Sequence, residues 1–112
     1  MDHKTILTAA HCVDGNWHHG GSAYTDWWIR AGTTDKYNGG QKIGISEIIV
    51  HPRWLDPINH YYTYADIAIV KIDEPLTFDA DVQPACLPSG PLGLQNGGDC
   101  WISGWGIYKS KC

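Results

Sequence analysis

Short apolar runs closed by turn residues are the feature that most limits what this chain can fold into. The clearest runs are Trp27–Ala31, Ile43–Val50 and Ile67–Ile72, and each ends at a glycine or within three residues of a proline. No stretch repeats its apolar residues at the spacing of a long amphipathic helix. The pattern is typical of an all-β fold and predicts strands over these three runs. Cys100–Gly106 is a weaker fourth candidate.

The run Ile67–Ile72 is apolar at nearly every position. Strands of this kind are usually covered on both faces, so we expect it to lie at the centre of the fold. One helical turn is expected at Thr8–Cys12, where Thr8 can cap the turn and two alanines favour it. The breaker Asp14-Gly15 limits this helix to a single turn.

Composition narrows the class of protein. The chain has 112 residues, 43% hydrophobic and 18% charged, which suits one globular unit rather than a disordered segment. The net charge of −4, with both signs interspersed, argues against nucleic acid or an anionic membrane as the main partner.

No apolar run approaches the roughly 18–20 residues of a membrane-spanning helix. No secretory signal follows Met1, so the chain is either cytosolic or begins upstream of the sequence given.

Four cysteines leave the compartment open. Cys12, Cys86, Cys100 and Cys112 form no C-x-x-C pair, which argues against a zinc ribbon or a thioredoxin-like redox site. They can form two disulfides in an oxidising compartment, or they can be buried thiols that pack as small hydrophobic side chains.

Two residues carry candidate chemistry. His11 lies in the small-residue segment Thr8–Cys12, and an imidazole with a pKa near 6.5 suits general-base work. Asp66 directly precedes the apolar run Ile67–Ile72, where a poorly solvated carboxylate needs a partner such as an imidazole N–H. The alternatives are a structural histidine and an aspartate that caps a turn.

Four motifs in order identify a resemblance. They are Thr8–Cys12 (TAAHC), Asp66–Ile72 (DIAIVKI), Gln83–Pro88 (QPACLP) and Gly104–Gly106 (GWG). Together they resemble the trypsin/chymotrypsin-like serine endopeptidases. The resemblance covers nearly the whole chain and implies an incomplete antiparallel β-barrel fold. Residues 1–112 are then part of one peptidase domain, with about 1–90 forming most of the first of two barrels. Residues from about 91 to 112 form the crossover and the first strand toward the second barrel.

The resemblance also implies roles for single residues. His11 becomes the general base and acid of a Ser-His-Asp triad, and Asp66 the carboxylate that orients it. Thr63, Tyr64 and Ala65 are expected beside the substrate cleft. The whole protein is then a serine-type endopeptidase that hydrolyses peptide bonds in protein or peptide substrates, without a cofactor, in a secreted or extracellular setting.

The nucleophile of that triad is not in this sequence. The family carries its serine in Gly-Asp-Ser-Gly-Gly, and Ser89, Ser103 and Ser110 lack this context. We expect the serine, the oxyanion hole and the specificity pocket to lie downstream, and the activation site upstream. The 112 residues alone are therefore expected to be inactive. Two alternatives remain: a non-catalytic, protease-like binding protein, and a small interaction module whose four cysteines pair internally.

By the same resemblance, three cysteines have disulfide partners outside this sequence. Cys12 is expected to pair with an upstream cysteine, Cys86 with a light chain or propeptide, and Cys100 with the second barrel, whereas Cys112 has no counterpart. No metal site is expected. The loop Thr33–Gln41 offers only Asp35 to a calcium ion, and His18-His19 are adjacent, which suits a zinc ion poorly.

Overall fold

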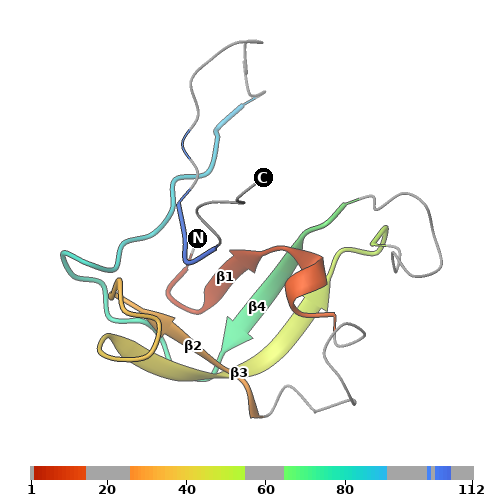
Figure 1. Ribbon diagram of the computed structural model, residues 1–112. Helices are drawn as coiled ribbons and strands as arrows, with labels where there is room; N and C mark the ends of the chain where they lie inside the picture. Colours follow the sequence, from red (N-terminus) through yellow and green to blue (C-terminus); the bar gives the residue numbers. More distant parts are fainter. Residues whose placement is uncertain (1, 15–25, 55–64, 91–100, 102, 107–112) are drawn as a thin grey trace, which may run out of the picture.

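The computed structural model describes residues 2–14, 26–54, 65–90, 101 and 103–106. Within them the chain forms four strands and one 3₁₀ turn, in the order β1 (Thr5–Thr8), η1 (Ala10–Cys12), β2 (Trp28–Ala31), β3 (Gln41–Val50) and β4 (Ala68–Ile72). The strands make one antiparallel sheet in the order β1-β4-β3-β2, which curls like an opened half-barrel (Figure 1). The all-β prediction is confirmed.

Strand β3 joins the two halves of the sheet. Its first residues pair with β2, for example Gln41 with Ala31, and its last residues pair with β4, for example Val50 with Ala68. Between Ile45 and Glu47, where the pairing of β3 with β2 ends, an irregularity shifts the register of β3 on β4. A bulge of this kind bends a strand and increases its twist, which accounts for the strong curvature of β3 in Figure 1.

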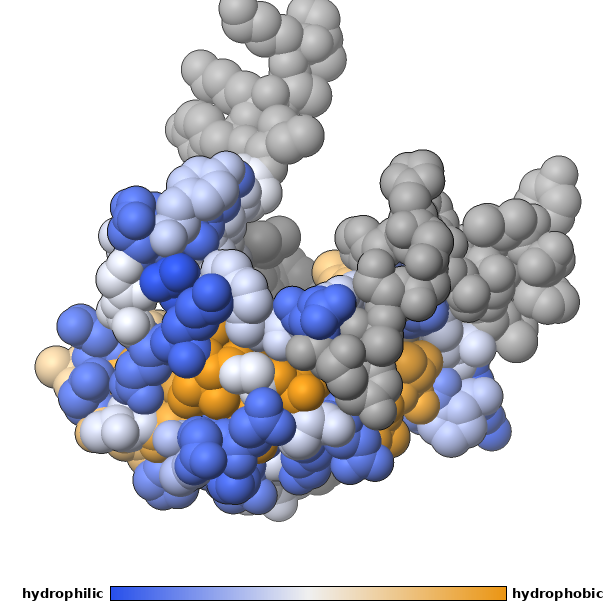
Figure 2. All heavy atoms as spheres, turned by 90° about the horizontal axis from the view of Figure 1, so that it is seen from below, coloured by the Kyte–Doolittle hydropathy of each residue, from blue (hydrophilic) through white to orange (hydrophobic). Residues whose placement is uncertain are grey.

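The core lies on one face of the sheet only. Along β4, burial alternates, with Ala68, Val70 and Ile72 buried and Ile69 and Lys71 half-buried between them. The buried cluster is completed by other strand and loop side chains: Ile45, Leu76 and Val82. The prediction that Ile67–Ile72 is covered on both faces is therefore wrong for the described residues, because only one face of the sheet packs against the core cluster. Hydrophobic side chains remain visible at the surface (Figure 2).

The helical turn is shorter than expected. Thr8 does not cap it but ends β1, and the capping position belongs to Ala9, which makes no side-chain cap hydrogen bond. The backbone holds the turn instead, through N–H donation from Cys12 to the Ala9 carbonyl (3.2 Å) and from Val13 to the Ala10 carbonyl (3.0 Å). Of the predicted strand Cys100–Gly106, residues 101 and 103–106 form no strand, and residues 100 and 102 lie outside the described residues.

The loop between β2 and β3 depends on two consecutive glycines with left-handed backbone, Gly39 (φ 74°) and Gly40 (φ 63°). A Cβ on Gly40 would collide with the Ala31 carbonyl oxygen, whereas one on Gly39 would come no closer than 3.5 Å, to the Thr33 hydroxyl. We expect Gly40→Ala to destabilise the chain by about 3 kcal/mol and Gly39→Ala by about 1 kcal/mol. Urea unfolding of the two variants checks this, and equal losses would contradict it.

Candidate active site

His11 and Asp66 are brought together by the pairing of β1 with β4. The two strands run antiparallel, with Thr8 opposite Ala68 as their last pair. The chain leaving β1 and the chain entering β4 therefore meet at the same end of the sheet. His11 lies in η1, three residues after β1, and Asp66 lies two residues before β4. Residues 55 positions apart in sequence thus become neighbours.

Two hydrogen bonds join the pair, and they use both carboxylate oxygens. The His11 ring nitrogen Nδ1 lies 2.6 Å from Asp66 Oδ2, and the backbone N–H of His11 donates to Oδ1 at 2.9 Å. The backbone hydrogen bond therefore holds the Asp66 carboxylate in place beside the His11 ring. The pair is open to solvent, with side-chain exposures of 53% for His11 and 36% for Asp66.

The backbone hydrogen bond from His11 is the main reason that the pKa of Asp66 lies below its ordinary value of 3.8. Partial desolvation opposes this effect, and the hydrogen bond to the His11 side chain supports it. Asp66 is therefore an anion at neutral pH and accepts hydrogen bonds. An imidazole that donates its Nδ1 proton to such an anion leaves Nε2 as an acceptor, which is the form a general base requires.

Ala65 sets the direction from which Asp66 arrives. It is the one described non-glycine residue with positive φ (57°), and its carbonyl accepts a hydrogen bond from Ile67 N–H at 2.7 Å. An alanine in this conformation stores about 1 kcal/mol or more of strain. The tight turn around Asp66 gave no sequence signal, because alanine is not a residue that favours left-handed backbone.

The second ring nitrogen of His11 also has a neighbour. The Cys12 sulfur lies 3.4 Å from His11 Nε2, within reach of a weak thiol hydrogen bond. Cys12 and Cys86 are exposed free thiols, whereas Cys100 and Cys112 lie outside the described residues. The expected disulfides stay predictions. The predicted cleft residues Thr63 and Tyr64 likewise lie outside the described residues.

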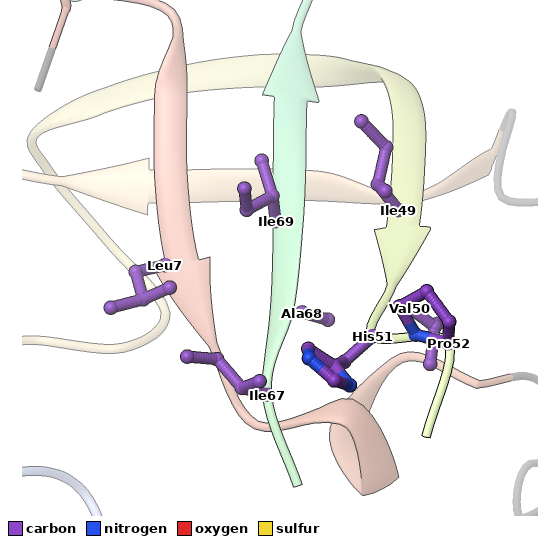
Figure 3. A pocket seen from close by; sticks show the side chains of 8 residues that line it. All are labelled: Leu7, Ile49, Val50, His51, Pro52, Ile67, Ala68 and Ile69. Carbon is purple, nitrogen blue, oxygen red and sulfur yellow. The ribbon is translucent and has the colours of Figure 1, made fainter. Parts of the chain in front are cut away.

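An apolar groove on the outer face of the sheet begins one residue beyond Asp66 (Figure 3). Its floor is a cross-strand row in which Leu7 of β1, Ile69 of β4 and Ile49 of β3 lie side by side. The walls come from the ends of β3 and β4 and include Ile67 and Pro52. Sequence reasoning did not predict this groove, because it follows from the register of three strands.

Other kinds of site find little support in the part of the chain that the structure describes. No three His, Cys, Asp or Glu side chains gather there in a way that could hold a metal ion. Asp35, the one carboxylate that the loop Thr33–Gln41 offers to a calcium ion, instead accepts hydrogen bonds from the backbone of Tyr37 (2.8 Å) and Asn38 (3.3 Å). The pair His18-His19 lies outside the described residues. None of the described helical segments has the length and apolar character to cross a membrane.

The lowered pKa of Asp66 predicts how stability responds to acid. A group whose folded pKa is depressed stabilises the fold above its ordinary pKa, and this stability is lost as the pH falls through the folded pKa. We expect wild type to be more stable than Asp66→Asn near neutral pH, and the difference to shrink below the ordinary value of 3.8. Asp2 and Asp35, whose pKa values are also lowered, are common to both proteins and cancel. Urea unfolding at several pH values tests this, and a difference independent of pH would contradict it.

Comparison with known protein sequences relates this chain to one family. The sequence model of the family described as Trypsin matches residues 1–112. Testisin from Homo sapiens is 31% identical to this chain over 122 residues, which cover 97% of the chain and 35% of testisin. The chain therefore spans about a third of the length of this curated relative.

Proposed function

Because this chain belongs to the trypsin family of serine proteases, we propose that the whole protein is a serine endopeptidase in which His11 and Asp66 supply two members of a Ser-His-Asp triad. The observation that carries the proposal is the contact between His11 Nδ1 and Asp66 Oδ2 at 2.6 Å, reinforced by the backbone bond at 2.9 Å. These two groups are the orienting half of the triad.

In this reaction each group has a defined task. Asp66 holds the imidazole with the proton on Nδ1, so that Nε2 of His11 accepts the serine proton as the hydroxyl oxygen attacks the peptide carbonyl. The negative Asp66 stabilises the imidazolium that forms. His11 then donates the proton to the leaving amine, and an acyl-enzyme remains for water to hydrolyse.

The remaining groups are proposed to come from outside these residues. The family's Gly-Asp-Ser-Gly-Gly motif does not occur in this sequence, so another segment of the whole protein supplies the nucleophile and the oxyanion hole. We assign residues from 1 to about 90 to the first barrel, and those from about 91 to 112 to the crossover and the first strand toward the second.

The cleft and the cysteines complete the proposal. Thr63 and Tyr64, which precede Asp66 in the chain, shape the substrate subsites for a protein or peptide. Cys12, Cys86 and Cys100 form disulfides with partners outside the chain, Cys86 with a light chain or propeptide. Exposed cysteines such as Cys12 and Cys86 suit an oxidising, extracellular setting, where disulfides persist.

Labelling with a fluorophosphonate tests the proposal, because this probe phosphonylates an activated serine with loss of fluoride. The whole protein should be labelled at a serine outside residues 1–112 and should cleave peptide substrates. The 112-residue polypeptide should show neither reaction. A folded whole protein that binds protein partners but is neither labelled nor active would instead be a non-catalytic binding protein, and the proposal would fail.

A further inference from the structure

Three side chains form a cationic aromatic surface on the outer face of the hairpin made by β2 and β3. Trp28 is 45% exposed. The Arg30 guanidinium carbon lies 5.1 Å from its centroid and the Lys42 ammonium nitrogen lies 4.2 Å from it. We call Trp28, Arg30 and Lys42 the β2–β3 patch. β1, which leads to His11, and β2, which carries Trp28 and Arg30, are the two opposite edge strands of the sheet. The patch is therefore well separated from His11.

The register makes the charge of this patch unusual. Arg30 and Lys42 are direct cross-strand partners, an arrangement that is normally destabilising for like charges. Among the described residues, neither forms a salt bridge with a carboxylate. The face of Trp28 offsets part of the repulsion, since an indole ring attracts a cation by about 0.5–1 kcal/mol at an exposed site.

Arg30 is also held in place. Its Nη1 donates to the Gly39 carbonyl in the loop, while its buried Nε has no hydrogen-bond partner among the described groups. The hydrogen bond from Nη1 therefore fixes the guanidinium in orientation. A fixed cation loses less side-chain entropy when it binds an anion than a mobile one does.

The surroundings keep the hairpin basic within an acidic chain. Residues 28–44 contain three of the eight basic residues and one of the twelve acidic residues. The third cation, Lys36, lies 4.9 Å from the centroid of the exposed Tyr37 ring. The one carboxylate, Asp35, accepts hydrogen bonds from Tyr37 and Asn38 of its own loop. These bonds, with a smaller contribution from the charge of Arg30, hold the pKa of Asp35 below its ordinary value of 3.8. Asp73 approaches from the end of β4, with its carboxylate beside Gly44, the residue that pairs with Trp28.

We propose that the β2–β3 patch binds an acidic segment of a partner protein in which carboxylates alternate with apolar side chains. The carboxylates meet Arg30 and Lys42, and an apolar side chain covers the exposed indole of Trp28. A sulfated glycan fits less well, because its affinity depends on a long array of cations and this patch offers two beside an open aromatic ring. The proposal does not depend on the proposed protease activity.

Binding to the 112-residue chain tests the proposal directly. The probe is a fluorescein-labelled octapeptide of alternating glutamate and leucine, followed by fluorescence anisotropy. We expect Lys42→Gln and Trp28→Leu each to weaken binding about fivefold. Arg53→Gln removes the same charge from an exposed residue just after β3, and it should change affinity less than about twofold. Asp73→Asn should strengthen binding, and higher salt should weaken it.

Several results would overturn the proposal. One is equal weakening by Lys42→Gln and Arg53→Gln, which would indicate only general charge attraction. Another is equal binding of an octapeptide with glutamine in place of glutamate. A third is tighter binding of a heparin octasaccharide than of the acidic peptide, which would make a sulfated glycan the occupant. Circular dichroism of each variant separates lost binding from lost folding.

Discussion

We expect asparagine in place of Asp66 to lower kcat of the whole protein about 10⁴-fold, the size of loss that follows removal of this carboxylate from a Ser-His-Asp triad. The amide keeps the shape of the side chain and its oxygen can still accept the backbone N–H of His11. Its NH₂ group, however, then faces His11 Nδ1 and donates to it. The imidazole must carry its proton on Nε2, where it cannot accept the proton of the serine.

The measurement is steady-state hydrolysis of a peptide substrate by purified whole protein. KM should change little, because Asp66 acts on the reacting proton and not on substrate binding. Asp81→Asn, at an exposed carboxylate in the loop after β4, is the matched control and should keep wild-type activity within about twofold. If Asp66→Asn retained wild-type kcat, the contact with His11 would be structural only.

We expect alanine in place of Ile72 to destabilise the 112-residue chain by about 4 kcal/mol. Ile72 is 2% exposed and is the largest fully buried side chain among the described residues. It packs in the cluster with Ile45, Val70 and Leu76. Removing three of its carbons loses their burial and leaves a cavity that strand β4 cannot close, because β1 and β3 hold it on both sides. Such a loss is a large part of the roughly 5–15 kcal/mol that stabilises a typical domain.

Ile49→Ala provides the matched control. It removes the same atoms from a strand residue on the opposite face of the sheet, where Ile49 is 43% exposed, and should lose less than about 1 kcal/mol. Urea unfolding followed by circular dichroism compares the two variants. Losses of similar size would mean that the core does not lie on the Ile72 face.

The strands that could be predicted were those whose apolar runs are closed by turn residues. The runs Trp27–Ala31, Ile43–Val50 and Ile67–Ile72 correspond closely to β2, β3 and β4, because an apolar stretch between turn residues has few alternatives. β1 (Thr5–Thr8) was missed because it runs directly into a segment with helical preference. Its strand conformation comes from pairing with β4, a tertiary contact.

The candidate site also has features that the sequence predicted and features that it did not. The residue types and their family motif singled out His11 and Asp66. The left-handed backbone of Ala65 and the N–H of His11 bonded to Asp66 gave no signal, because both arise from how two distant segments meet. The β2–β3 patch was also missed. Arg30 and Lys42 become neighbours only through the register of β2 on β3, which the apolar pattern did not determine.

Inactivation of the whole protein by a peptidyl chloromethyl ketone tests most directly whether His11 is the general base. The active serine adds to the ketone carbonyl, and the Nε2 atom of the triad histidine displaces chloride from the neighbouring carbon, so that one inhibitor joins both residues. Mass spectrometry of the digested protein should find the peptide that contains His11 carrying the inhibitor, in step with loss of activity. Alkylation of a different histidine, with His11 unmodified in the inactive protein, would contradict the assignment.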